Sequence, residues 1–395
     1  MPYGTIISEP LTRFKDPVTG RQMIRVTDLA AHCHHPYFYS RMFTPDGKKL
    51  MYTSYRTGRP NAYLVDLASG RSMQLTDAKA MDGFMSTLSA DGTSLFYVDG
   101  NSLMRLAIDS GKTETLYTQQ PPYDERALYP GFSSDYRYVL LSQMHRDDIV
   151  KGKSGWDAFE PQFRAAPRCR LLYLDLVRGT EHVVLEEQCW LGHPQIHPKD
   201  PGLLMYCHEG PGHLIDNRMW LIRNDGTQQR PIQISNREKF GTPSKEIVTH
   251  EYFTPDGTYA AAVYLPGPTP GRIVLAALST GDITDLGEVH SYLHFIHSPD
   301  MRYIVGDERS SAMNTAAIWV FDMATKQEMK ICLHASSLKP RGASTQDAHP
   351  HPSFSPDMRY ILFSSDRETS PDGNCAVYLA DVNDLKQQLQ TISNR

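Results

Sequence analysis

An acidic turn followed by an apolar strand recurs seven times along the 395 residues of this chain. The turns centre on Asp46, Asp91, Asp135, Asp200, Asp256, Asp300 and Asp357. Consecutive turns are 45, 44, 65, 56, 44 and 57 residues apart, so a unit of about 44 residues is lengthened by three insertions. A repeat of this length, with several strands in each copy, is typical of the blades of a β-propeller.

A second run of alternating apolar residues follows each of these strands and ends in another turn, as in AYLVDLASG at 62–70. Strand, tight turn, strand, loop and strand is the order within a four-stranded blade. No linker rich in Gly, Ser or Pro divides the chain. The sequence therefore predicts an all-β fold, a seven-bladed β-propeller that forms one domain over 1–395.

Both ends of the chain have a predicted place in this fold. QMIRVTD at 22–28 resembles RSMQLTD at 71–77, the outer strand of the first repeat, yet it precedes the first turn. We therefore predict that this N-terminal strand is the outer strand of the seventh blade and closes the ring, which removes an exposed sheet edge. The last twelve residues, DLKQQLQTISNR, predict a short helix.

The longest insertion, at 146–170, lies between two predicted strands of the third blade. It contains the aromatic residues Trp156, Phe159 and Phe163. Loops of this length in a compact domain are functional or disordered, and the aromatic residues favour a packed flap. We expect this flap to be a candidate lid over the axial pocket.

Histidines recur at one position of three consecutive blades. His250, His294 and His351 each lie six residues before the Asp of their own turn. The strand that leads into the turn is expected to be the innermost of its blade, so all three imidazoles should lie at the mouth of the central channel. His349 is two residues before His351 and therefore shares its face of an extended strand.

This pattern predicts a divalent-metal site with the ligands His294, Gln346, His349 and His351. Nitrogen and amide oxygen ligands suit Mn, Fe, Ni or Zn rather than Ca. A single histidine is more often a satisfied core or surface residue than a ligand, but three matches in consecutive blades favour a site. The ligand from blade six stays open, because His290 and His297 are further candidates.

Composition and the remaining motifs exclude several classes. A net charge of −5 gives no overall positive field for nucleic acid or an anionic membrane. The N-terminus lacks a secretory signal and no apolar stretch is long enough to span a bilayer, so we expect a cytoplasmic protein. Six dispersed cysteines are expected to be reduced and to pack in the core. No GxSxG, Walker, GxGxxG or HExxH motif occurs.

The chain also resembles the oligogalacturonate lyases, seven-bladed propeller enzymes of intracellular pectin breakdown. The resemblance rests on segments along nearly the whole chain: HHPYFYSRMFTPDGKKLMYTS, GWDAFEPQFRAAPRCRL, YCHEGPGHLIDNRMWLIRNDGT, VTHEYFTPDG, HFIHSPDMRYIVGD and QDAHPHPSFSPDMRYILFSSDR. It implies manganese as the metal, bound by the four residues that the register selected. It also implies that His250 is the catalytic base and that Arg218 is a catalytic and substrate-binding residue; His208, in the same segment as Arg218, is a further candidate for substrate binding.

The reaction implied by this resemblance is β-elimination in short oligogalacturonates, namely digalacturonate and its unsaturated analogue, to a 4-deoxy-5-keto uronate. The C5 proton is weakly acidic, so its removal needs a base and a cation that neutralises the charge developing on the carboxylate. Two other classes stay open. A non-catalytic TolB-like propeller would share the repeat, and a metal-dependent uronate isomerase or hydrolase could use the same ligands. The sequence leaves the oligomeric state undetermined.

Overall fold

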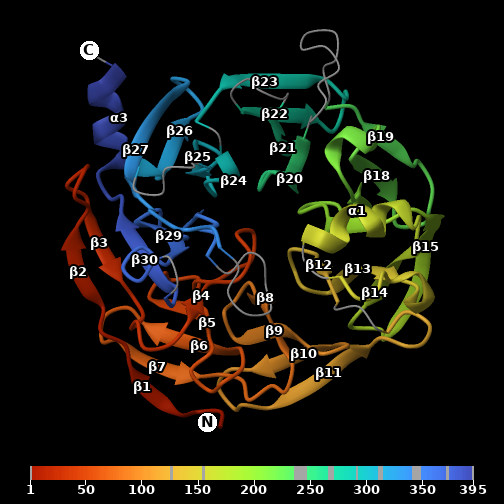
Figure 1. The fold of residues 1–395 in the computed structure, drawn as a ribbon, viewed down its shortest axis with the longest axis horizontal. Helices are drawn as coiled ribbons and strands as arrows, with labels where there is room; N and C mark the ends of the chain where they lie inside the picture. The colour runs from red at the N-terminus through yellow and green to blue at the C-terminus, as the bar shows by residue number, and fades with distance from the viewer. Residues whose placement is uncertain are drawn as a thin grey trace. The chain divides into compact units, whose positions relative to one another are not determined.

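The structure of this chain is a computed structural model that describes residues 2–124, 128–153, 156–234, 247–265, 271–290, 292–309, 315–339, 348–370 and 373–393. Its strands form seven sheets, two with five strands and five with four (Figure 1). Each sheet corresponds to one predicted blade. The fold is therefore the all-β, seven-bladed β-propeller that the repeat predicts.

The first three sheets follow the chain from the N-terminus. The first, in the order β1-β7-β6-β5-β4, contains β1 (Ile6–Ser8), β4 (Cys33–His34), β5 (Lys49–Ser54), β6 (Asn61–Asp66) and β7 (Arg71–Gln74). The second contains β8 (Met81–Leu88), β9 (Ser94–Asp99), β10 (Ser102–Ala107) and β11 (Thr113–Thr118). The third contains β12 (Pro130–Phe132), β13 (Tyr138–Met144), β14 (Arg168–Asp175) and β15 (Thr180–Gln188).

The other four sheets carry the candidate functional residues. The fourth contains β16 (Leu191–Ile196), β17 (Leu203–His208), β18 (Met219–Arg223) and β19 (Arg230–Ile232). The fifth contains β20 (Ile247–Phe253), β21 (Tyr259–Leu265), β22 (Arg272–Ala277) and β23 (Ile283–Glu288). The sixth contains β24 (Tyr292–His297), β25 (Tyr303–Glu308), β26 (Ala317–Asp322) and β27 (Gln327–Leu333). The seventh contains β2 (Thr12–Lys15), β3 (Gln22–Arg25), β28 (Ser353–Phe354), β29 (Tyr360–Ser365) and β30 (Ala376–Asp381).

The N-terminal segment completes the seventh sheet, as predicted. β3 pairs antiparallel with β30, with Ile24 opposite Leu379. The structure adds a strand that the sequence did not predict, because β2 pairs with β3 and forms the outer edge in its place. β1 adds a fifth strand to the first sheet in the same way, beside β7. The N-terminal segment therefore contributes strands to two blades.

The repeated turns are held by one side-chain pattern. In six of them a Ser or Thr hydroxyl donates to the Asp two residues later, as Thr254 Oγ1 does to Asp256 Oδ1 at 2.6 Å. The same hydroxyl oxygen accepts a hydrogen bond from the backbone N–H of Tyr259 at 3.0 Å. In the fourth blade His197 replaces the hydroxyl residue, and its Nδ1 accepts from the backbone N–H of Asp200 at 2.9 Å. The Asp residues therefore cap the turns, which is the usual function of Asp in this position.

The hydrophobic core consists of layers between consecutive sheets. One layer lies between the sixth and seventh sheets and includes Val305, Val320, Ile361 and Phe363. Other layers lie between the seventh and first, first and second, third and fourth, and fourth and fifth sheets. The middle strands of the first, fourth and seventh sheets are therefore covered on both faces, which is why their sequences are continuous apolar runs rather than strict alternations.

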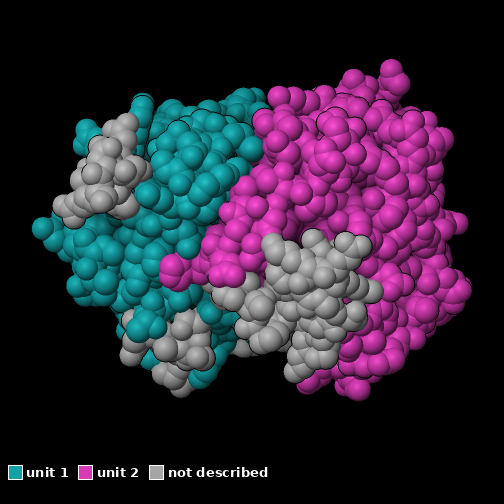
Figure 2. All heavy atoms as spheres, turned by 90° about the horizontal axis from the view of Figure 1, so that it is seen from above, with its two compact units in different colours: residues 1–100, 104–115, 291–395 teal, residues 101–103, 116–290 magenta. Residues whose placement is uncertain are grey.

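The chain divides into two compact units, coloured separately in Figure 2. Unit 1 consists of residues 1–100, 104–115 and 291–395, and unit 2 of residues 101–103 and 116–290. The prediction of one domain over 1–395 stays a prediction.

The helices of the described residues lie in the insertion, before β18 and at the C-terminus. The 146–170 insertion contains η1 (Arg146–Asp148) and α1 (Trp156–Arg164), and Phe159 contacts Trp190 edge to face with ring centroids 5.4 Å apart. The insertion is therefore packed within unit 2, against the segment before β16, whereas its action as a lid stays a prediction. A further short helix, η2 (Gly212–Leu214), precedes β18, and α3 (Leu385–Ser393) is the predicted C-terminal helix. Among the described residues, no helix has the length and apolar character needed to cross a bilayer.

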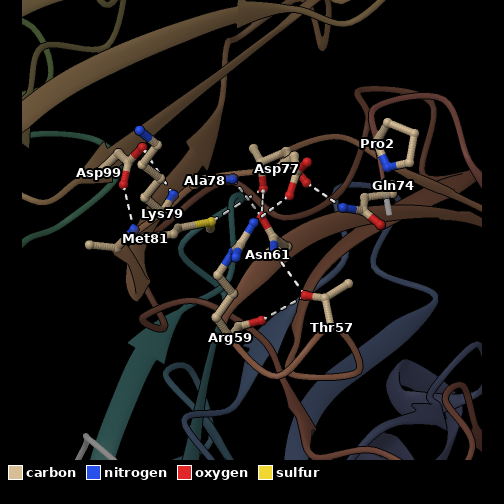
Figure 3. A network of polar contacts seen from close by, with 12 residues as sticks. Pro2, Thr57, Arg59, Asn61, Gln74, Asp77, Ala78, Lys79, Met81 and Asp99 are labelled. Carbon is tan, nitrogen blue, oxygen red and sulfur yellow. Dashed lines mark hydrogen bonds and ion pairs between the residues drawn. The ribbon is translucent and has the colours of Figure 1, made fainter.

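The buried side-chain amide of Asn61 connects two loops of the first blade (Figure 3). Asn61 Oδ1 accepts hydrogen bonds from Thr76 Oγ1 and from the backbone N–H of Ala78, both at 2.9 Å. Its Nδ2 donates to Thr57 Oγ1 at 3.0 Å. The amide thereby joins the loop before β6 to the loop after β7.

Candidate functional site

Three histidines of unit 1 converge on one point. His294 lies in β24, and His349 and His351 precede β28. One ligand nitrogen from each ring lies within 4.8 Å of the others, and the rings of His294 and His351 are centred 4.0 Å apart. His294 and His351 are buried and His349 is half-buried. The structure thus brings together three of the four ligands that the sequence predicts.

Asp307 fixes the orientation of His294. Its Oδ1 accepts from the backbone N–H of His294 at 2.6 Å, and its Oδ2 lies 2.9 Å from Nδ1 of the same residue. Burial opposes the charge of Asp307, but the adjacent His294 outweighs it and the pKa of this carboxyl is lowered. An ionised carboxylate holds the proton on Nδ1, so Nε2 presents its lone pair. This carboxylate–histidine arrangement is common behind metal ligands.

His349 has the properties of a neutral ligand. Burial, and then the neighbouring His294, lower the pKa of His349 to about 3, so the imidazole is uncharged at neutral pH. Its Nδ1 is buried, and among the described residues it has no hydrogen-bond partner. A buried nitrogen that is left without a partner costs free energy unless a ligand satisfies it. This donor set fits a divalent transition metal.

The segment HHPYFY of the first blade surrounds the three histidines. The ring of Tyr37 is centred 5.0 Å from that of His351, and the ring of Phe38 is centred 5.8 Å from that of His294. His35 Nε2 lies 2.9 Å from the carbonyl oxygen of Pro350, the residue between the two seventh-blade histidines. These contacts place the imidazoles in a largely apolar environment, which strengthens electrostatic interactions.

The other candidates for this site lie apart from it or outside the described residues. Gln346 lies outside the described residues. His290 is exposed, and His297 is buried but does not join the group that could hold a metal. Of the three histidines considered in the sixth blade, His294 is the one that faces His349 and His351.

In unit 2, Arg218 is held between two carboxylates. Its Nη1 and Nη2 donate to the two carboxylate oxygens of Glu209 at 2.8 and 3.3 Å, and its Nε donates to Glu251 Oε2 at 2.9 Å. Burial opposes the charge of Glu209, but Arg218 and then His193 outweigh it and lower its pKa to about 2. The edge of the guanidinium that suits bidentate binding of a carboxylate is therefore engaged by Glu209.

His250 lies at an irregular position of β20. The pairing of β20 with β21 shifts by one residue between Thr249 and Tyr252, which is the signature of a β-bulge. His250 has φ of +56°, a left-handed conformation that costs a residue with a Cβ roughly 1–2 kcal/mol. Bulges re-aim side chains and are frequent beside active sites. Because Glu251 is the next residue, the ion pair with Arg218 directly adjoins His250.

His208 lies on the other face of β17 from Cys207 and Glu209. Its Nε2 lies 3.1 Å from Glu187 Oε2, and its ring stacks on Trp220 with centroids 4.8 Å apart. The structure therefore does not bring the His208 side chain to the Arg218 ion pairs, and its binding role stays a prediction.

A second group of potential ligands, His193, Cys207 and Glu251, lies around Arg218. Burial raises the pKa of the Cys207 thiol well above its ordinary value, so the sulfur is protonated. Glu251 is already paired with the guanidinium. This group is therefore better described as part of an ion-pair network than as a metal site.

Comparison with known proteins identifies the family. The family model described as oligogalacturonate lyase matches residues 1–385. The chain belongs to the oligogalacturonate lyase family. It is 33% identical to an oligogalacturonate lyase of Dickeya dadantii, with 97% of this chain and 99% of the relative covered. It is also 33% identical to an oligogalacturonide lyase of Pectobacterium atrosepticum, with coverages of 95% and 97%.

Solved structures of oligogalacturonate lyases share the fold. One, in complex with manganese, has a TM-score of 0.89 at 34% identity and covers 96% of this chain and 98% of its own. Another, from Vibrio parahaemolyticus, has a TM-score of 0.88 at 30% identity, with coverages of 97% and 99%. The resemblance inferred from the sequence motifs is therefore confirmed.

In this member of the oligogalacturonate lyase family, His193 shares the blade position of His250, His294 and His351, which was not recognised from the sequence. It lies four residues before the turn-capping His197, as His250, His294 and His351 lie four residues before Thr254, Ser298 and Ser355. The pairing of β16 with β17 also shifts at His193. Counting from Asp200 hid this match, because the fourth turn is one residue longer; counting from the capping residue would have found it.

Proposed function

We propose that this chain is a lyase that cleaves short oligogalacturonates, digalacturonate and unsaturated digalacturonate, by metal-assisted β-elimination to a 4-deoxy-5-keto uronate in pectin breakdown. The observation that carries the proposal is the convergence of three largely buried histidines in a member of the oligogalacturonate lyase family. A cytoplasmic enzyme acting on small imported substrates would suit this role.

His294, His349 and His351, together with Gln346, are the proposed ligands of a divalent metal, with manganese as the expected ion. The proposal is supported by the buried Nδ1 of His349 and by the contact of Asp307 with His294. A relative of known structure is in complex with manganese. A divalent cation bound there supplies positive charge that stabilises the carboxylate on which negative charge develops during elimination.

His250 is the proposed base that takes the C5 proton. An imidazole has an ordinary pKa near neutral pH, so its neutral form accepts a proton readily in this range. The proposal is supported by the position of His250 in its blade, which matches that of His294 and His351 in theirs. The bulge in β20 supports it further, because strained backbone conformations such as that of His250 cluster at active sites.

Arg218 and His208 are the proposed substrate-binding residues. Three N–H groups of Arg218 donate to Glu209 and Glu251, so contact with a substrate carboxylate would use its other N–H groups. His208 would approach the substrate from the face of β17 that is opposite to Cys207 and Glu209.

The test is an assay of the metal-stripped protein with digalacturonate and with unsaturated digalacturonate, with and without added manganese. Digalacturonate should yield a conjugated unsaturated uronate detected by ultraviolet absorbance, and activity should depend on metal. His349→Ala should lose both metal and activity, whereas His250→Ala should lose activity and retain metal.

Other outcomes of this assay would indicate another class of protein. Turnover of uronates without an unsaturated or 4-deoxy-5-keto product would indicate an isomerase or hydrolase. A folded, metal-loaded protein that turns over no uronate would indicate a binding propeller.

A further inference from the structure

We propose that Gln195 and the ion pair between Glu251 and Arg218 are positioning residues that hold His250 in its left-handed conformation. This inference rests on the proposed function, in which His250 takes the proton. All of these residues belong to unit 2.

The bulge interrupts the hydrogen-bond ladder of β20. Thr249 is opposite Val263 and Tyr252 is opposite Ala261, so two residues, His250 and Glu251, face a single residue of β21. Backbone groups at a bulge lose their partners in the neighbouring strand. Since buried N–H and C=O groups need partners, other groups must satisfy them. Without such partners the left-handed conformation of His250 would relax.

Gln195, in the preceding blade, contacts the backbone at the bulge and just after it. Its Nε2 donates to the carbonyl oxygen of Glu251 at 2.7 Å, and its Oε1 accepts from the backbone N–H of Phe253 at 3.2 Å. A carboxamide is suited to this task because it carries a donor and an acceptor on one group. The Gln195 side chain therefore bridges the backbone on the C-terminal side of His250.

The side chain of Glu251 is held by Arg218. It is fully buried, and its Oε2 accepts from Arg218 Nε at 2.9 Å. Arg218 is fixed in turn by the bidentate pair with Glu209. Arg218, the residue before β18, thus anchors the residue next to His250. It therefore acts on His250 through Glu251 whether or not it also contacts the substrate.

His193 faces the same network. Its Nδ1 lies 3.8 Å from Glu251 Oε1 and its Nε2 lies 3.5 Å from Glu209 Oε2. Arg218 therefore holds Glu251 through Oε2, whereas Oε1 of Glu251 accepts no hydrogen bond from the described residues and faces His193. The bulge is held at its backbone by Gln195 and at its side chain by this network.

Gln195→Glu is the sharpest variant, because it keeps the shape of the side chain but removes the donor. At neutral pH the new carboxylate would face the carbonyl oxygen of Glu251 and repel it. We expect kcat on digalacturonate to fall about 10- to 100-fold, as for a small misplacement of a reacting group. KM and manganese binding should change far less than kcat, because Gln195 contacts backbone groups of β20 and none of the proposed substrate-binding or metal-binding side chains. Gln143→Ala, which removes a buried amide from β13, is the matched control and should retain kcat.

A double-mutant cycle tests whether Gln195 acts through His250. In the His250→Ala background, Gln195→Glu should cause no further loss of the residual rate, because the group that it positions is gone. An equal loss in both backgrounds, or full activity of Gln195→Glu in the wild-type background, would overturn the inference.

Hydrogen exchange separates this inference from the proposed function. Amides of 247–253 should exchange faster in Gln195→Ala than in wild type or Gln143→Ala, at a temperature well below the melting temperature of all three proteins. Unchanged exchange would overturn the positioning role even if the wild-type protein turned over no uronate. An inactive wild-type protein with faster exchange in Gln195→Ala would contradict the lyase proposal and retain the structural role.

Discussion

Asp307 shows how a residue that would not touch a metal can decide whether the site binds one. It lies opposite the irregular pairing of β24 with β25, between the partners of Tyr292 and Phe295. From there its carboxylate reaches both the backbone N–H and Nδ1 of His294. The tautomer and the orientation of the proposed ligand therefore depend on one buried aspartate.

Replacing Asp307 by Asn should weaken manganese binding about 10- to 100-fold, the usual effect of removing a carboxylate behind a metal ligand. The amide keeps the size of the side chain but removes the charge that stabilises the proton on Nδ1. Metal affinity would be measured by titration of the stripped protein. Asp16→Asn, which alters another buried aspartate of unit 1, should bind manganese like wild type. Equal affinities of wild type and Asp307→Asn would show that Asp307 is only structural.

Glu9 is a second buried carboxylate whose partners predict a large effect. Its side chain is fully buried and accepts from Arg56 Nη2 at 2.5 Å, Tyr52 Oη at 2.6 Å and the backbone N–H of Asp28 at 2.9 Å. Glu9→Ala leaves Arg56 in the interior without this carboxylate and should destabilise the protein by about 3–5 kcal/mol.

Urea unfolding followed by circular dichroism measures this loss. Glu114→Ala is the control, because Glu114 pairs with Arg105 at the exposed surface and such pairs contribute less than about 1 kcal/mol. Similar midpoints for the two variants would contradict the importance of the buried pair.

At the scale of the elements, the turns could be predicted from the sequence, whereas the irregular strand pairings could not. The turns could be recognised because the Thr254 and Asp256 pattern acts within six residues. The bulges at His193, His250 and His294 depend on pairing with the next strand, and no local signal marks the extra residue. For the same reason Asp307 and Gln195 could not be predicted: their partners become neighbours only once these irregular pairings form.

The N-terminal strand β3 allows a test of how much this strand contributes to the stability of the protein. Met23 is 1% exposed and packs in the layer between the sixth and seventh blades. Met23→Ala should destabilise the protein by about 2–5 kcal/mol, because it removes buried methylene groups and leaves a cavity. Val18→Ala, in the exposed turn between β2 and β3, should change stability by less than about 0.5 kcal/mol. Thermal unfolding of both variants would decide; an unaffected Met23→Ala would mean that β3 contributes little.

At the scale of the molecule, the sequence predicted the number of blades and their order, because seven copies of one turn are a stronger signal than any single strand. It did not predict the fifth strands β1 and β2, which precede the first turn and match no repeat. His250, His294 and His351 were found because they share one register, and His349 because it lies two residues before His351. The fourth member of that register, His193, was missed because of one inserted turn residue.

The cysteines allow a test of whether the whole chain unfolds as one domain. All six lie in the described part of the chain, where none forms a disulfide and five are buried. Burial raises the pKa of Cys33 to about 11, so at pH 8 about one molecule in a thousand carries its thiolate, the reactive form. Burial likewise raises the pKa of Cys189 to about 12. Labelling of the native protein should therefore be slow, and it should accelerate when the surrounding blade unfolds.

Labelling in increasing urea, with each cysteine quantified by mass spectrometry, then compares the two compact units. Cys33 and Cys332 report on unit 1, and Cys169 and Cys207 on unit 2. Strands β10 and β11 each contain residues of both units, so unfolding one unit disrupts strands that belong to the other. We therefore expect one urea midpoint for all four thiols, as for a cooperative domain. Two separate midpoints would show that the chain consists of two domains, whereas rapid labelling without urea would contradict the burial of the thiols.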